Sequence, residues 1–353
     1  GMVARVTEGV TQSPGAMAIS ATNDPKNAYK LAYNMGKELQ LLGFNFNFAP
    51  VGDINNNPKN PVINVRSYSE DPDIVSEYVV EAVKGYSDAL MMSSIKHFPG
   101  HGDTAVDSHI GLPVVDFDEK RLYEMELKPF IKAKELDLPG IMVSHVMFTK
   151  YDDKYPATLS KKLVQGLLRD EIGYDGLVVT DSLTMKAVFN NYTLEEIVLN
   201  GFNSGDDILL LCGARDIKLQ TDFYETAIRL VKEGKISEAK IDESVARIFK
   251  YKEKFIREMD ESFDDIKDRL CEKEAIEFAE KVSLDSITLI DDSKKLLPLK
   301  KEEKVLIVFP KIQVVTLVEN DEFGLMSLAE FMPFKCDKMY MTLSPDENEQ
   351  DIL

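Results

Sequence analysis

Tryptophan is absent from this 353-residue chain, and cysteine is scarce, with three residues. Cys212, Cys271 and Cys336 form an odd and scattered set that lacks the spacing of metal ligands. Such a set excludes a fold held together mainly by disulfides. We therefore interpret the three cysteines as free or buried thiols.

Basic residues are also few relative to acidic ones. The chain has 42 Lys and Arg residues and 61 Asp and Glu residues, which gives a formal net charge of −19 at pH 7. A surface this acidic repels phosphate backbones and anionic lipid, and the most basic segment, residues 294–304, has acidic residues among its lysines. No apolar stretch is long enough for a membrane span, and residues 1–25 lack the order of an export signal. We expect a soluble, cytoplasmic protein without nucleic-acid or membrane partners.

Short apolar segments alternate with longer segments in which apolar residues recur every three or four positions. This pattern predicts helices at 27–42, 74–90, 129–136, 163–172 and up to residue 201. It predicts strands at 44–48, 93–98, 140–146, 176–180 and 207–211. Strands that alternate with helices in this way are typical of a parallel sheet, either doubly wound or closed as a (β/α) barrel.

The pattern changes towards the carboxyl end of the chain. Residues 217–285 read as almost continuous helix, and we place the end of the first domain at residue 285. Residues 286–353 then form a smaller α/β unit, with strands predicted at 286–290 and 305–309 on either side of a lysine-rich turn at 296–301.

All four histidines lie between residues 97 and 145, and three of them fall within residues 96–109. Lys96 and His97 end a predicted strand and precede a glycine-rich loop, which is where parallel α/β proteins place their sites. A metal site is one interpretation, but Pro99 and Gly100 prevent the helix that would align His97 with His101. A purely structural role stays open as well, above all for His101 and His145.

Three carboxylates also lie at candidate positions. Asp107 and His109 are two residues apart, so in an extended segment the carboxylate can orient the imidazole as a general acid and base. Asp181 ends an apolar strand, where it is either catalytic or the cap of the next helix. Asp53 and Arg66 also follow predicted strands, and each alone fits a structural salt bridge or cap better than a functional role.

Together these segments resemble the family 3 glycoside hydrolases, specifically their β-N-acetylglucosaminidase branch. The resemblance spans residues 1–285 and is carried by residues 48–53, 57–67, 96–109 and 178–183. It implies a TIM-type (β/α) barrel as catalytic domain over residues 1–285, followed by a partial α/β domain over residues 286–353. Gly1 to Arg5 resembles the end of a family segment that reads Asp-Gln-Glu-Gly-Gly, so we expect the barrel to lack its first strands.

The resemblance also implies roles for individual residues. Asp181 matches the nucleophile, His109 the acid and base, and Asp107 its partner on a loop that glycines 100 and 102 would allow to close. The other matched positions are expected to bind the sugar: Arg66, Lys96, His97, Asp53 and His145. No metal or organic cofactor is implied.

The expected reaction is retaining hydrolysis of terminal, non-reducing N-acetyl-β-D-glucosaminides, such as GlcNAc-MurNAc fragments in peptidoglycan recycling. A phosphorylase or another family 3 β-glycosidase is the alternative enzyme. An inactive, truncated sugar-binding fragment is the alternative outside catalysis. A second copy of the chain is a candidate partner that would cover the open edge of the barrel.

Overall fold

The computed structural model describes residues 6, 8–108, 111–212, 217–258, 260–300, 304–310, 332 and 334–341. It divides into two compact units, one formed mainly by residues 5–287 and the other mainly by residues 288–353. The domain functions assigned to 1–285 and 286–353 from the sequence stay predictions.

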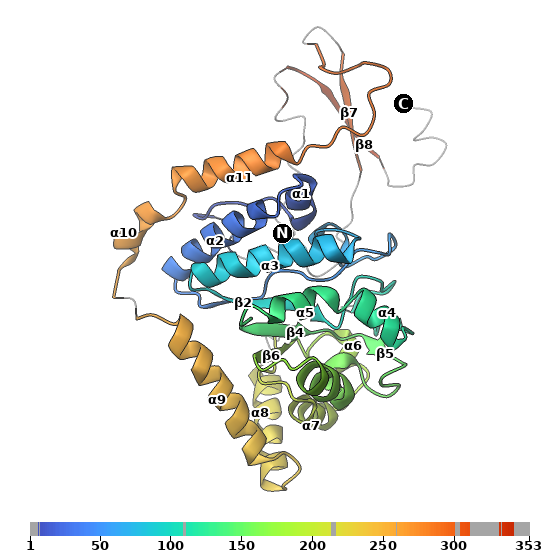
Figure 1. The fold of residues 1–353 in the computed structure, drawn as a ribbon, viewed down its shortest axis with the longest axis vertical. Helices are drawn as coiled ribbons and strands as arrows, with labels where there is room; N and C mark the ends of the chain where they lie inside the picture. Colours follow the sequence, from blue (N-terminus) through green and yellow to red (C-terminus); the bar gives the residue numbers. More distant parts are fainter. Residues whose placement is uncertain are drawn as a thin grey trace. The chain divides into compact units, whose positions relative to one another are not determined.

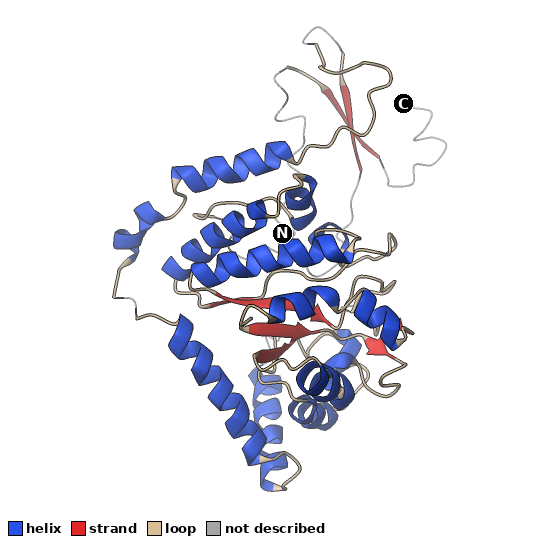
Figure 2. Ribbon diagram, in the orientation of Figure 1, coloured by secondary structure: helices blue, strands red, loops and turns tan. Residues whose placement is uncertain are grey.

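A parallel four-stranded sheet lies at the centre of the first unit, with its strands side by side in chain order (Figures 1 and 2). The strands are β1 (Phe46–Asn47), β2 (Met92–Phe98), β4 (Gly140–Val143) and β6 (Leu177–Thr180). β4 and β6 are buried throughout, because helices and loops leave neither face of the sheet to solvent. Sequential parallel strands are the arrangement found in a (β/α) barrel, here open in the described residues.

The crossovers between these strands are helical. α2 (Lys26–Leu41) and α3 (Pro72–Asp88) pack against each other, and α5 (Lys128–Lys134) packs beside α3. The approach of α2 to α3 requires glycine, since a Cβ on Gly85 would lie 2.2 Å from the carbonyl oxygen of Tyr29. This close contact explains a glycine in the middle of a helix, where it otherwise costs stability.

The remaining helices of the first unit complete its core. They are α1 (Ala16–Ala21), α4 (Glu119–Glu124), the π-helix η3 (Lys162–Glu171), α6 (Lys186–Phe189), α7 (Leu194–Ser204), α8 (Ile217–Lys232), α9 (Glu238–Phe255), α10 (Phe263–Ile266) and α11 (Lys273–Asp285), with short 3-10 turns at Asn64–Arg66, Ala157–Leu159 and Lys267–Arg269. Tyr251 and Phe255 of α9 pack on Met92 and Leu177, the first residues of β2 and β6. α11 returns to contact α1 and α2, as Figure 1 shows.

In the part of the chain that the structure describes, two short parallel pairs lie outside the central sheet. β3 (Val114–Val115) pairs with β5 (Met147–Phe148) in the first unit. In the second unit, β7 (Leu306–Pro310) pairs with β8 (Asp337–Met341). β7 confirms the strand predicted at 305–309.

Two of the predicted elements are wrong in part, and a third is wrong altogether. The strand predicted at 207–211 is reduced to one bridge between Ile208 and Val179, because the next backbone donor, on Leu210, bonds to the hydroxyl of Thr180. The continuous helix predicted at 217–285 is broken into four, first at Gly234, whose φ of 70° is left-handed. Residues 286–290 form no strand.

The two glycines after β2 lie in close packing, and the loop closure expected from the resemblance stays a prediction. A Cβ on Gly100 would lie 2.7 Å from Cγ of Glu126, and one on Gly102 would lie 1.7 Å from the carbonyl oxygen of Ile54. Both positions therefore pack against neighbouring chain that leaves no room for a side chain.

Replacing Gly102 with alanine is expected to lower the free energy of unfolding by about 3 kcal/mol, because the backbone of Ile54 has to move. Urea unfolding followed by circular dichroism measures this loss. Gly15→Ala is the matched control, since its Cβ would meet nothing closer than 3.9 Å and its φ of −70° suits alanine. Equal stability of the two variants would contradict the packing argument.

Candidate active site

The candidate residues lie where the parallel strands end. Lys96 and His97 belong to β2, His145 follows β4 and Asp181 follows β6. Asp53 follows Val51, which bridges to Lys96. Because the strands are parallel, their carboxyl ends share one edge, and these side chains are brought to it together.

Arg66 lies among three of the candidate carboxylates. Its side chain is buried and donates to the carbonyl oxygen of Val62 at 3.0 Å. Burial lowers the pKa of Arg66, while the charges of Asp53, Asp181 and Asp107 act in the opposite direction. The fold therefore brings carboxylates up to 128 positions apart in the sequence, from 53 to 181, within electrostatic range of one guanidinium.

Both carboxylate oxygens of Asp53 bond to the segment that contains His97 and His101. Its Oδ2 lies 2.6 Å from Nδ1 of His97, and its Oδ1 accepts from the backbone N–H of His101 at 2.7 Å. Burial raises the pKa of Asp53, but His97 outweighs burial and lowers it below the ordinary value. The carboxylate has no exposed surface. Asp53 therefore orients the His97 ring with Nδ1–H as donor, which leaves Nε2 available to other groups.

Asp181 remains partly exposed at the end of β6. Its Oδ1 accepts from the backbone N–H of Ser182 at 2.7 Å. Burial acts to raise the pKa of Asp181, but the nearby His145 and His97, this hydrogen bond and Lys96 together lower it to about 2. The carboxylate is therefore ionised at neutral pH, in a residue that keeps part of its surface exposed.

His145 is near Asp181 but occupied by other partners. It is buried, with Nε2 2.8 Å from the carbonyl oxygen of Ser182 and Nδ1 2.8 Å from the hydroxyl of Thr158. The hydroxyl of Thr158 also donates to the carbonyl oxygen of Ser144 at 2.8 Å. His145 therefore connects the end of β4 to the residue after Asp181.

Asp107 is buried in the loop after β2, and its charge acts on Arg66. The loop is bound on both sides of this residue, since the Asp107 carbonyl accepts from Gly111 N–H at 3.0 Å and the Ser108 carbonyl accepts from Ala187 N–H at 3.2 Å. His109 lies outside the described residues, so its pairing with Asp107 stays a prediction.

Sequence reasoning missed how fully His101 is bonded. Both ring nitrogens of His101 bond to hydroxyl groups, Nδ1 to Thr104 at 2.7 Å and Nε2 to Ser108 at 3.1 Å. The crowding of histidines in residues 96–109 draws attention to His101. Nothing in the sequence distinguishes Thr104 and Ser108 as its partners.

Burial, with His97 nearby, lowers the pKa of His101 to about 4. In the unfolded chain His101 is protonated below about pH 6.5, whereas in the folded protein it is protonated only below about pH 4. The free energy of unfolding therefore falls as the pH falls through this range. We expect His101 to contribute about 2 kcal/mol of this loss between pH 7 and pH 5. Urea unfolding at both pH values should show a shallower dependence in His101→Gln. Equal dependence in the two proteins would refute the assignment.

Within the described residues, no group of three or more His, Cys, Asp or Glu side chains is arranged to hold a metal ion. No helix of this part of the chain is long and apolar enough to cross a membrane.

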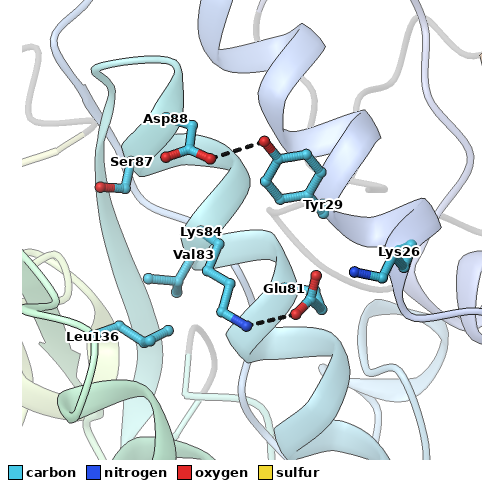
Figure 3. Close-up of a pocket in the computed structure, with 8 residues that line it drawn as sticks. All are labelled: Lys26, Tyr29, Glu81, Val83, Lys84, Ser87, Asp88 and Leu136. Carbon is cyan, nitrogen blue, oxygen red and sulfur yellow. Dashed lines mark hydrogen bonds and ion pairs between the residues drawn. The ribbon is translucent and has the colours of Figure 1, made fainter.

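A cavity of about 360 Å³ opens at the surface between α2, α3 and the turn after α5 (Figure 3). Four of its polar side chains form two pairs, Tyr29 with Asp88 at 2.8 Å and Lys84 with Glu81 at 2.7 Å. Asp88 ends α3, shortly before β2 begins, so the cavity lies towards the amino end of that strand. It is separate from the edge that carries Asp181.

A parallel α/β unit with charged side chains gathered at the carboxyl ends of its strands defines an enzyme domain of the (β/α) barrel class. Residues 1–251 match the family described as glycosyl hydrolase family 3 N terminal domain. The chain therefore belongs to glycosyl hydrolase family 3. The match confirms both the resemblance to this family and the expected barrel-type fold.

Relatives with assigned names agree with this family. The chain is 39% identical over 274 residues to beta-hexosaminidase A of Pseudoalteromonas piscicida, a match that covers 72% of this chain and 46% of that protein. The chain thus spans about half the length of this curated relative.

Solved structures share the fold over almost the whole chain. A family 3 beta-N-acetylglucosaminidase from Paenibacillus sp. str. FPU-7 superposes with a TM-score of 0.88 at 37% identity, covering 100% of this chain and 68% of that one. The beta-glucoside phosphorylase BglX superposes with a TM-score of 0.83 at 25% identity, covering 94% of this chain and 62% of that one.

Proposed function

We propose that this chain hydrolyses terminal, non-reducing N-acetyl-β-D-glucosaminides and retains the configuration at the anomeric carbon. The observation that carries the proposal is Asp181, an ionised carboxylate in a partly exposed residue at the end of β6, with Arg66, Lys96 and His97 near it. The names of the relatives from Pseudoalteromonas piscicida and Paenibacillus support the choice of sugar.

In the proposed first step, a carboxylate oxygen of Asp181 attacks the anomeric carbon and the bond to the leaving group breaks. His109, oriented by Asp107, gives its proton to the departing glycosidic oxygen. In the second step, the neutral imidazole takes a proton from water, whose oxygen attacks the glycosyl-enzyme and releases Asp181. Two inversions at the same carbon give net retention.

The other candidate residues divide into two groups. Arg66, Lys96 and His97 are proposed to bind hydroxyl groups of the sugar. Asp53 and His145, which we expected to contact the sugar, are instead proposed as positioning residues, because their polar atoms already bond to His97, His101, Ser182 and Thr158. Asp53 orients His97, and His145 supports the segment that follows Asp181.

The natural substrate is proposed to be a GlcNAc-MurNAc fragment of peptidoglycan, as expected from the sequence. Competition between this disaccharide and a β-glucoside tests that choice against another family 3 β-glycosidase activity. The predicted second copy of the chain at the open barrel edge is tested by the mass of the protein in solution.

Phosphorolysis is the second candidate, favoured by the likeness to the phosphorylase BglX. A neutral histidine in place of a second carboxylate would lessen the repulsion of a phosphate that attacks the glycosyl-enzyme. In this reaction phosphate replaces water, and the product is the sugar 1-phosphate.

Chromophore release from 4-nitrophenyl N-acetyl-β-glucosaminide, with and without phosphate, tests both reactions. Release of free N-acetylglucosamine without phosphate supports hydrolysis, whereas a product that forms only with phosphate supports phosphorolysis. Binding of N-acetylglucosamine by the folded protein without any turnover would support the alternative of an inactive sugar-binding fragment.

A further inference from the structure

His101 connects two points of the loop that follows β2. Its ring is 2% exposed, and its two nitrogens bond to the hydroxyl groups of Thr104 and Ser108. These partners stand three and seven positions further along the chain. Because Ser108 is next to Asp107 in the chain, this contact restrains the segment that carries the predicted acid and base.

The direction of these hydrogen bonds follows from the neighbours of the ring. The hydroxyl of Thr104 donates to the carbonyl oxygen of His101 at 3.0 Å, so its oxygen remains to accept from Nδ1–H. Burial lowers the pKa of His101, so the ring is neutral at pH 7 and Nε2 accepts from the hydroxyl of Ser108. Each group of the bridge therefore has a suitable partner.

His101 is itself held by elements outside the loop. The backbone N–H of His101 donates to Oδ1 of Asp53 at 2.7 Å, and the backbone carbonyl oxygen of His101 accepts from Nδ2 of Asn60 at 2.8 Å. Asn60 is buried, and its Oδ1 accepts from the N–H groups of Val62 and Ile63. The backbone of His101 is thus held by Asp53 and Asn60, and its imidazole connects this anchored position to the part of the loop that contains Asp107.

We propose that His101 is a positioning residue that holds Asp107 in place by binding the hydroxyl groups of Thr104 and Ser108 together. The proposal rests on the function proposed above, in which His109 transfers the proton. His101 has no contact with the reacting atoms in this account. It acts through Ser108 and the carboxylate beside it.

A latch of this kind affects proton transfer more than sugar binding. Protonation of the leaving group matters most when that group is a poor one, because a good leaving group departs without help. Loss of the Ser108 hydroxyl should therefore slow the cleavage of 4-methylphenyl N-acetyl-β-glucosaminide much more than the cleavage of the 2,4-dinitrophenyl compound. The KM for the sugar should change little.

The experiment compares Ser108→Ala, His101→Gln and the double variant on both substrates. We expect each single variant to lower kcat/KM for the 4-methylphenyl substrate roughly tenfold, the effect of about one hydrogen bond. The double variant should lose less than twofold more, because both changes remove the same contact. Ser76→Ala is the matched control, since it removes a buried hydroxyl on α3 that bonds to the carbonyl oxygen of Pro72.

If the parent is active, either of two results would overturn the latch. One is an equal loss of kcat/KM on the two substrates, and the other is a loss in the double variant that equals the product of the two single losses. A parent that releases neither aryl group would instead refute the proposed function. In that case amide hydrogen exchange decides the latch: residues 104–108 should exchange faster in Ser108→Ala than in the parent or in Ser76→Ala. Unchanged exchange would overturn the latch.

Discussion

Asp181→Asn is expected to lower kcat for 4-nitrophenyl N-acetyl-β-glucosaminide on the order of 10⁴-fold, because an amide does not form the glycosyl ester. The structure keeps this carboxylate ionised, with a pKa of about 2, so the variant loses a negative charge at every working pH. The defect should therefore have the same size at pH 5 and pH 8. Initial rates at saturating substrate measure it.

A second carboxylate beside β6 supplies the control. Asp175 lies before the first residue of the strand, is largely exposed and pairs with Arg247 at 3.3 Å. Asp175→Asn should keep its activity within about twofold, as expected for an exposed ion pair. If Asp181→Asn kept more than a tenth of the parent rate while folded, another residue would have to be the nucleophile. An acid-quenched digest should locate the glycosyl adduct on the Asp181 peptide of the parent.

His109→Ala is expected to produce the second largest loss, about 10² to 10³-fold in kcat, since proton transfer to the glycosidic oxygen and from the attacking water is lost. Azide should restore much of the rate with a good leaving group, because this anion attacks the glycosyl-enzyme without a general base. The product should be the β-glycosyl azide. Rates with increasing azide and the product's anomeric configuration, determined by NMR, test both expectations.

Asp107→Asn should lower kcat less than His109→Ala does, because the imidazole remains and only the carboxylate charge that supports it is lost. Asp103→Asn is the control on the same loop. Its carboxylate pairs with Arg121 at 3.0 Å, and its loss should leave the azide response unchanged. Absence of azide rescue in His109→Ala would assign proton transfer to a different group.

Local sequence pattern was sufficient for the main elements of the first unit. The apolar spacing in residues 27–42 predicts α2, and the apolar segments 93–98 and 176–180 predict β2 and β6. These predictions succeeded because each depends on periodicity within a few turns or residues of chain. The same reasoning places Asp181 at the end of a buried strand, where the structure has it.

Tertiary structure decided how the polar groups of the site are used. Asp53 and His97 are 44 positions apart, and only the alignment of β2 beside Val51 brings them within 2.6 Å. Residues 207–211 have the composition of a strand, yet a side-chain hydroxyl takes the hydrogen bond that would extend the ladder.

By itself, then, the sequence determined the main helices and strands around the sheet, the family and the candidate residues, because these follow from local patterns. It did not determine that Asp53 bonds to His97 and His101, that His145 bonds to Ser182 and Thr158, or that His101 joins Thr104 to Ser108. Those assignments depend on which donor meets which acceptor across the packed chain. Burial then makes each of these pairings matter, since an unpaired polar group away from water is costly.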